Sequence, residues 1–252
     1  MTEKIIVAFD IGHGIDTYPP NKGIGNFAEF SFNNAVVKLA KPLAELNGFK
    51  VFLPQPFDSK EVPLNSRILA IKANRCKLVI STHGNAGVSS ANGREAWYWQ
   101  ESLQSERLAN LWLANSESLK TNNRGSKKSN YDKGRNFAIT RDNHKNNIPA
   151  IITECGFFTN DKERALMQTD DFQMKCAIAM VKTTCDYFNM PFKLEADKEV
   201  VELKQQSTWS IQATNWALEN KVSDCSRLAD IATREEVITM LYKYDQYLNS
   251  KE

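Results

Sequence analysis

Short apolar runs alternate with helical patterns along the first 190 residues, and this alternation restricts the possible folds more than any other feature of the sequence. The runs Lys4–Phe9 and Lys77–Thr82 are rich in apolar and β-branched residues and predict strands. Glu29–Asn47 carries apolar residues at three- and four-residue spacing and predicts a helix, although Pro42 inside it predicts a kink. This order predicts an α/β domain over 1–190, in which helices flank a largely parallel sheet.

The same patterns place the remaining elements of this domain. The expected strands are Phe49–Leu53, Arg94–Trp99 and Ala150–Thr153, and the expected helices are Leu64–Arg75, Glu101–Ser118 and Asp171–Phe188. In the helix over 101–118, the expected core residues are Leu103, Leu108 and Leu111. The basic run 124–135 predicts a solvated loop, with attraction of an anionic polymer as the alternative. His144 lies in a polar run that also predicts a loop, and we expect a structural role for it rather than a substrate contact.

Composition excludes several classes of protein. Of the 252 residues, 42% are hydrophobic and 25% are charged, which is typical of a folded globular protein rather than a disordered one. No apolar run approaches the ~18 residues that cross a bilayer, so we expect no membrane insertion. The apolar run that begins at Ile5 is too short for a signal peptide, so we expect synthesis in the cytoplasm without an export signal.

The cysteines predict reduced thiols. Their number is odd, at 5, and no Cys-x-x-Cys pair occurs. Cys155 lies beside an acidic residue, yet we expect it to pack as a small hydrophobe rather than to act as a nucleophile.

The charge balance changes along the chain and indicates a second module. Residues 1–193 carry 25 basic and 19 acidic side chains, whereas 194–252 carry 7 basic and 11 acidic ones. We therefore expect a linker over 191–206 and a small all-α module over 207–252. No nucleic-acid recognition motif accompanies the basic residues, so we expect no nucleic-acid partner.

Three predicted strands end in unusual polar residues. The segments are Phe9–Gly14, Ile80–Ala86 and Ile152–Asn160. Because ligand sites in open α/β sheets form outside the carboxyl ends of the strands, we expect His13, His83 and Glu154 to converge. Glu29 opens the first long helix, and its carboxylate could point back toward the same edge.

Two imidazoles and a carboxylate form a normal catalytic zinc set, which leaves one position for water. His13, Glu29 and His83 would be the ligands, and Glu154 would transfer protons as general base and acid. The sequence also allows simpler, non-catalytic roles for these four residues. The two histidines could cap turns, Glu29 could be an acid favoured by the helix dipole, and Glu154 could be a buried salt-bridge partner.

Taken in order, the motifs around these residues resemble those of the zinc-dependent N-acetylmuramoyl-L-alanine amidases of the type-3 family. The resemblance covers roughly residues 4–188. The matching segments are Asp10-Ile11-Gly12-His13-Gly14, Glu29 at a helix start, Leu64-Asn65-Ser66-Arg67 with Ala73-Asn74, Ser81-Thr82-His83-Gly84-Asn85-Ala86, Arg124-Gly125, and Pro149-Ala150 through Glu154-Cys155-Gly156-Phe157 to Asn160. Each segment alone has little specificity, but their order and spacing are specific. The departures are Gly84, where the family more often has Ala, and Cys155, which occupies a variable position.

The resemblance implies one Zn²⁺ held by His13, Glu29 and His83, catalysis by Glu154 and substrate binding by Asn85. The implied reaction is hydrolysis of the amide bond between N-acetylmuramic acid and the L-alanine of the peptidoglycan stem peptide. The expected role is that of a phage endolysin acting on the cell wall after release, with a host autolysin as an alternative. A zinc peptidase or carboxypeptidase acting on wall peptides, or a non-catalytic wall-binding protein, is also open, since ligands alone do not name the scissile bond.

The C-terminal module has the pattern of two short helices. Residues of one helical face are Trp209, Ala213, Trp216 and Ala217, and Thr233 with Glu236 forms a capping box for the next helix. Segment 207–245 resembles one S-layer-homology motif, which implies binding of a secondary wall polymer with Arg234 as a contact. That family generally uses three copies, so we expect this single copy to form a homodimer or to pack on the first domain. The alternative is that the two tryptophans are simply core residues.

Overall fold

The described part of the chain covers residues 4–132 and 134–194, with residues 239, 242 and 244, in a computed structural model. The chain divides into two units between Leu194 and Glu195. The predicted linker over 191–206 and the predicted module over 207–252, with Arg234, lie almost entirely outside the described residues. They stay predictions.

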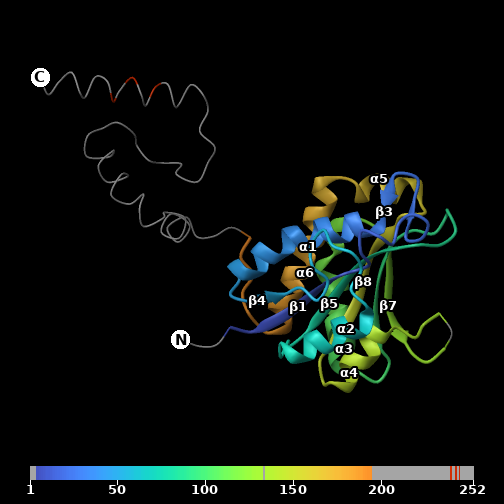
Figure 1. Ribbon diagram of the computed structural model, residues 1–252, viewed down its shortest axis with the longest axis vertical. Helices are drawn as coiled ribbons and strands as arrows, with labels where there is room; N and C mark the ends of the chain where they lie inside the picture. The colour runs from blue at the N-terminus through green and yellow to red at the C-terminus, as the bar shows by residue number, and fades with distance from the viewer. Residues whose placement is uncertain (1–3, 133, 195–238, 240–241, 243, 245–252) are drawn as a thin grey trace, which may run out of the picture. The chain divides into compact units, whose positions relative to one another are not determined.

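A six-stranded sheet forms the centre of the first unit (Figure 1). Its strands, in spatial order, are β4 (Lys50–Phe52), β1 (Ile6–Ile11), β5 (Val79–Asn85), β8 (Ala150–Phe157), β6 (Arg94–Trp99) and β7 (Asn123–Ser129). Every neighbouring pair is parallel except β8 and β6, which run antiparallel. The largely parallel sheet expected from the sequence is confirmed.

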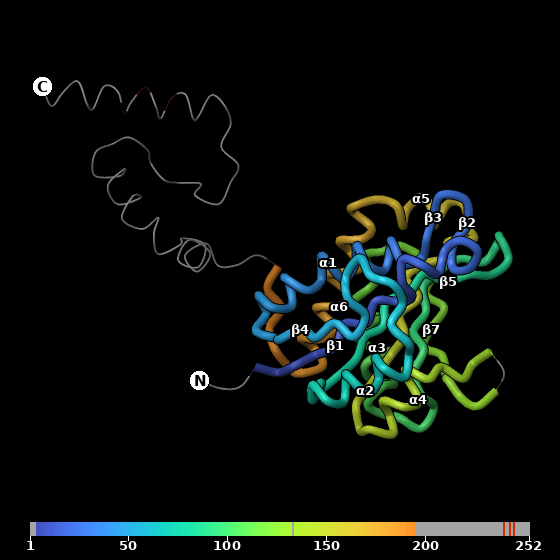
Figure 2. The backbone as a smooth tube through the Cα atoms, in the orientation of Figure 1, coloured from blue at the N-terminus to red at the C-terminus, as the bar shows by residue number. Residues whose placement is uncertain are grey.

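Helices cover both faces of this sheet and bury two apolar clusters. On one face lie α1 (Glu29–Leu46), α3 (Leu103–Asn115) and α6 (Asp170–Tyr187), and on the other lie α2 (Leu64–Ala73) and α4 (Ala138–Lys145). The remaining elements are the hairpin of β2 (Gly23–Ile24) and β3 (Phe27–Ala28), the short helix η1 (Glu117–Leu119) and α5 (Asp161–Met167). Figure 2 shows α5 and the hairpin at one end of the unit, with α2 and α4 toward the other.

Local sequence signals explain where several helices begin. The Asn160 side chain accepts hydrogen bonds from the backbone N–H groups of Lys162 and Glu163, so this last residue of the third motif caps α5. Thr169 caps α6 in the same way. α1 continues through Pro42 as one helix, although Pro42 has no N–H group to donate to the preceding turn.

The structure corrects three sequence predictions. Residues 123–129 form β7 rather than a loop, because their main chain pairs with β6 at the edge of the sheet. His144 lies in the last turn of α4, where a basic residue suits the carbonyl end of the helix dipole. Leu103 is 80% exposed, because α3 buries a face that contains Leu108 and Trp112 instead.

The four cysteines of the described residues are buried free thiols. Cys155 is among them and belongs to the core cluster on the α1 face, as expected for a small hydrophobe. Cys225 lies outside the described residues. No helix in the described part of the chain has the length and apolar character needed to cross a membrane.

Two leucines of α3 provide a matched test of the packing. Leu108 is 0% exposed, whereas Leu103 is 80% exposed. We expect Leu108→Ala to lower the free energy of unfolding by about 2–5 kcal/mol, because it leaves a cavity in the core. Leu103→Ala should change it by less than about 0.5 kcal/mol. Urea unfolding followed by circular dichroism would measure both, and equal effects would show that α3 buries a different face.

Candidate metal centre

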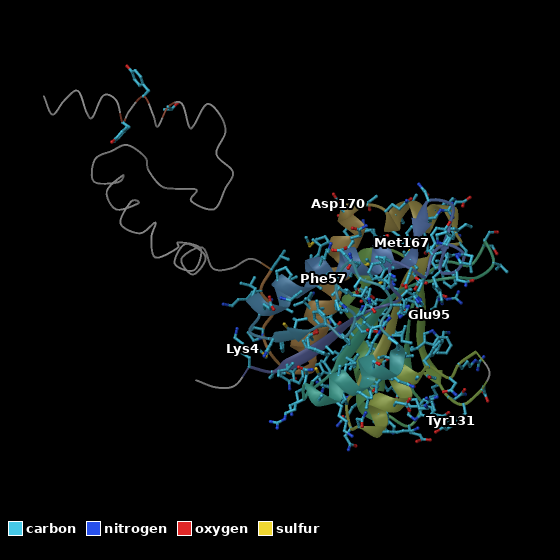
Figure 3. The ribbon with its side chains drawn as sticks, viewed as in Figure 1. Lys4, Phe57, Glu95, Tyr131, Met167 and Asp170 are labelled. Carbon is cyan, nitrogen blue, oxygen red and sulfur yellow. The ribbon has the colours of Figure 1, made fainter. Side chains whose placement is uncertain are left out.

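Two rows of side chains lie across the sheet near the carboxyl ends of β1, β5 and β8. Because paired residues on neighbouring strands share a face, the register places His83, Glu154 and Glu95 in one row, here called the reactive row. The adjacent row, here called the support row, consists of Asp10, Ser81, Ile152 and Trp97. Glu95, which belongs to β6, is labelled in Figure 3. The three predicted strand ends therefore meet.

A tight turn after β1 brings His13 to this edge. His13 has a φ of 68°, in the left-handed region, and stands between two glycines. A Cβ atom on Gly12 would lie 2.4 Å from His83 Cε1, and one on Gly14 would lie 2.1 Å from the backbone nitrogen of Glu61. Both glycines of the Gly-His-Gly motif are therefore required by close approach.

Glu29 reaches the same place from the first turn of α1. The β2–β3 hairpin leads into this helix, and the Glu29 backbone N–H donates to the Lys22 carbonyl at 2.9 Å. Its side chain is only 2% exposed, although it carries a carboxylate. A buried carboxylate requires partners that compensate for lost hydration.

Those partners are the two histidines. His83 Nδ1 lies 2.9 Å from Glu29 Oε1, and His13 Nε2 lies 3.2 Å from Glu29 Oε2. The two imidazole rings meet edge to face with centroids 5.0 Å apart. One potential ligand atom from each of the three residues lies within 4.8 Å of the others. The structure thus brings the three predicted metal ligands together.

The same contacts shift the pKa values of Glu29 and His83. Burial acts to raise the pKa of Glu29, but the close contacts and charges of the two histidines outweigh it and hold that pKa well below its usual value. Burial acts to lower the pKa of His83, but the hydrogen bond and charge of Glu29, together with the charges of Glu154 and Asp10, outweigh it and raise that pKa. Without a metal, Glu29 is therefore held as a carboxylate, and His83 keeps its proton to a higher pH than an ordinary histidine does.

These residues fit a zinc ion. His13 Nε2 is buried and has no hydrogen-bond partner, a state that a cation at the centre of the trio would relieve. Two imidazole nitrogens and a carboxylate oxygen are ligands that zinc prefers, and three protein ligands leave a position open, as catalytic sites do.

Glu154 stands beside the trio as a carboxyl group with different properties. Its Oε2 atom is buried without a hydrogen bond, so it is not the buried salt-bridge partner that the sequence left open. Burial raises its pKa to about 7, with the His83 charge opposing this shift and the charges of Glu29 and Glu95 adding to it. Such a group can take up and release a proton near neutral pH.

A cavity of about 680 Å³ opens over these residues. His13, Glu29, His83 and Glu154 line it, and so does Asn85. This is the size and setting expected for a ligand site at the carboxyl edge of a sheet.

Asn85 is held in place by a residue that the sequence analysis missed. Asn85 Nδ2 donates to Glu95 Oε1 at 3.0 Å, and Trp97 Nε1 donates to the same oxygen at 3.0 Å. Arg124 Nε donates to Glu95 Oε2 at 2.7 Å and so explains the Arg-Gly motif in part. Glu95 lies in a strand without any polar motif, so only the cross-strand register could have revealed it. Substrate binding by Asn85 stays a prediction.

Two other candidates are not part of the site. His144 does not line the cavity. Cys155 neighbours Glu154 in sequence, but it points into the apolar cluster on the opposite face of the sheet.

Comparisons with known proteins find a matching family and a relative of similar sequence. Residues 7–184 match the Amidase_3 family, described as N-acetylmuramoyl-L-alanine amidase. The chain is 30% identical over 135 residues to the uncharacterized protein YqiI of Bacillus subtilis (strain 168), and this match spans 52% of this chain and 61% of that protein.

Two solved structures share the fold. One is the catalytic domain of CwlV, an N-acetylmuramoyl-L-alanine amidase from Bacillus (Paenibacillus) polymyxa var. colistinus, with 25% identity and a TM-score of 0.65 over 74% of this chain and 99% of that one. The other is the N-acetylmuramoyl-L-alanine amidase from Clostridium difficile 630, with 26% identity and a TM-score of 0.65 over 75% of this chain and 98% of that one.

The pKa of His83 predicts how metal binding depends on pH. A zinc ion must displace the proton of His83, and the raised pKa means that this proton competes at a higher pH than for an ordinary histidine. We expect zinc affinity to fall by up to about tenfold per pH unit below that pKa. Titration against a chromogenic chelator between about pH 5.5 and 8.5 would measure it.

Two single-histidine variants serve as controls for this titration. His13→Ala should abolish tight binding, whereas His144→Ala should leave both the affinity and its pH dependence unchanged. An affinity that stays constant over the whole pH range would contradict the proposed ligand set.

Proposed function

This chain belongs to the Amidase_3 family of N-acetylmuramoyl-L-alanine amidases, and on that basis we propose that it is a zinc-dependent peptidoglycan hydrolase. The bond cut is the amide between the lactyl group of N-acetylmuramic acid and the L-alanine of the stem peptide. The matched residues, 7–184, include all three proposed ligands and Glu154.

One observation carries this proposal. Three side chains of metal-binding chemistry meet at the carboxyl edge of the sheet, and an unpaired carboxyl group of raised pKa stands beside them in the reactive row. The trio and the carboxyl group are the two parts that a metal-assisted amide hydrolysis requires.

Metal binding and proton transfer fall to different residues. His13, Glu29 and His83 would hold the zinc ion, which when bound supplies an activated water and a polarised substrate carbonyl. Glu154 takes the proton of the attacking water on its unpaired Oε2 atom. The protonated carboxyl group then delivers that proton to the amide nitrogen, so that L-alanine leaves as a free amine. A pKa of about 7 suits both steps.

The amidase, peptidase and wall-binding alternatives differ in the new chemical ends that digestion of the wall would create. A muramoyl amidase releases stem peptides with N-terminal alanine and leaves free lactyl carboxyl groups on the glycan. A zinc peptidase or carboxypeptidase would cut within the peptide instead, and a wall-binding protein would create no new ends. Mass spectrometry of digested wall distinguishes the three.

Glu154→Gln tests the role of the carboxyl group. The amide cannot accept the proton of water, so we expect activity on purified peptidoglycan to fall by about 10²–10⁴-fold. Zinc content should be unchanged, because Glu154 is not one of the three proposed ligands. Glu101→Gln, the same change at an exposed position before α3, should keep full activity. Unchanged turnover of Glu154→Gln would remove this residue from the mechanism.

We also propose a role in bacterial lysis for the whole chain. The enzyme would act as an endolysin that reaches the wall after release, and segment 207–252 would bind a secondary wall polymer or mediate a homodimer. Support comes from the S-layer-homology-like pattern of that segment and from its acidic charge, which differs from that of the first unit. A host autolysin is the second candidate for this role.

Deletion of residues 195–252 tests the role of the tail. The remaining unit contains the sheet, both apolar clusters and the proposed metal centre, so we expect it to hydrolyse soluble wall fragments at an unchanged rate. Its attachment to whole walls in a sedimentation assay should be weaker than that of the full chain. Equal attachment would leave the tail without a wall-binding role.

A further inference from the structure

Arg67 is a buried cation beneath the candidate metal centre. It lies in the first turn of α2 and is only 3% exposed. Its Nη1 atom donates to Asp10 Oδ1 at 3.2 Å and to the Ile11 carbonyl at 2.9 Å. Its Nε atom donates to the Val62 carbonyl at 2.8 Å, and its Nη2 atom to Glu61 Oε1 at 3.3 Å. Every nitrogen of the guanidinium group thus donates a hydrogen bond to another group of the protein.

One carboxylate partner of Arg67 leads to His83. The Ser81 hydroxyl donates to Asp10 Oδ2 at 2.6 Å, and the same hydroxyl oxygen lies 3.2 Å from His83 Nε2. A hydroxyl has one proton, and here Asp10 receives it. Ser81 must therefore accept the proton of His83 Nε2. With Nε2–H directed to Ser81, Nδ1, which faces Glu29 at 2.9 Å, is the nitrogen that offers its lone pair once a metal displaces its proton.

The other carboxylate partner of Arg67 leads to His13. Glu61 Oε1 lies 3.7 Å from His13 Nδ1, a looser contact to a side chain that is 42% exposed. With a metal bound at Nε2, Glu61 is the carboxylate available to receive the Nδ1 proton. Nε2 is the buried atom that has no hydrogen-bond partner and faces Glu29.

We propose that Arg67 is a positioning residue that sets the tautomer and orientation of both metal-binding imidazoles, tightly through Asp10 and Ser81 and more loosely through Glu61. This inference rests on the proposed zinc centre. A histidine can bind a metal only through a nitrogen that carries a lone pair, and its other nitrogen is fixed by the group to which it donates. Here one cation holds both of the groups that accept those protons.

The support row therefore has a chemical role and not only a packing role. Asp10 and Ser81 are paired in register on β1 and β5, and both are about 1% exposed. Arg67 approaches them from α2 and also holds the turn after β1 through the Ile11 carbonyl. The same contacts that fix α2 to β1 thus fix the direction of the ligand atoms.

The test uses the full chain in zinc-free and zinc-loaded forms, with two readouts. Competition with a chromogenic chelator gives the zinc dissociation constant. Long-range ¹H–¹⁵N correlation spectra give the tautomer of each imidazole, and the 3 histidines of the chain keep such spectra simple. His144 lies outside the centre and serves as an internal reference.

Ser81→Ala is the decisive variant, because it removes one hydroxyl and leaves the Arg67–Asp10 pair intact. We expect zinc to bind about 10–100-fold more weakly, as is typical when a ligand loses its outer partner. The His83 signals should move toward a mixture of tautomers, while those of His13 stay unchanged. Thr183→Ala, which removes another fully buried hydroxyl in α6, should alter neither readout.

Two further variants separate the two contacts. Glu61→Gln should change the His13 signals alone, with a loss of zinc affinity smaller than that of Ser81→Ala. Arg67→Lys cannot reach both carboxylates at once and should change the signals of both histidines. This joint change, with the His144 signals unchanged, distinguishes the positioning role from a general loss of structure.

The outcomes that overturn the inference differ from those that overturn the proposed function. If Ser81→Ala keeps the wild-type zinc affinity and the wild-type tautomer of His83, the positioning role is wrong, although the zinc enzyme stands. If the wild-type chain does not bind zinc, or if His13→Ala binds it equally well, both the metal centre and this inference are wrong.

Discussion

A carboxylate buried between two imidazoles is the interaction on which the candidate site depends. Glu29 is almost fully enclosed, and an ionised carboxylate in such a position is unfavourable unless opposite charge and hydrogen bonds compensate for the lost water. His83 supplies both and His13 contacts the other carboxylate oxygen. This is possible only because Gly12 lets the turn after β1 come close to His83 of β5, and Gly14 lets it pass close to the backbone at Glu61. The fold therefore creates a place where positive charge is required. A proton meets this requirement without a metal, and a divalent cation would meet it better.

Much of the fold could be predicted from the sequence, because strands that are buried on both faces and helices with one apolar face leave strong periodic signals. The failures have physical reasons. β7 is rich in Gly, Ser and Lys, so its strand conformation comes from pairing with β6 rather than from its own residues. Leu103 fits a helical pattern, but it lies outside the face of α3 that packs on the core.

Some residues of the site could be predicted from the sequence, and others could not. His13, His83 and Glu154 could be found from the sequence because polar residues at strand ends are conspicuous, and Glu29 because it opens a helix. Glu95 and the roles of Asp10, Ser81 and Arg67 could not be found, since they depend on which residues face each other across strands that are far apart in the chain. Register is a property of the whole sheet and leaves no local signal.

The reversed direction of β6 affects how the substrate selectivity of such a site can change. β1, β5 and β8 present their carboxyl ends to the cavity, but β6 runs antiparallel to β8 and presents its beginning. The cavity wall that contains Glu95 and Trp97 is therefore preceded by the connection over residues 86–93, which carries none of the proposed ligands or proton-transfer groups. Insertions or deletions in that connection would reshape substrate selectivity while leaving the chemistry intact. An ancestral scaffold of this kind could acquire new specificities by exchanging one peripheral segment.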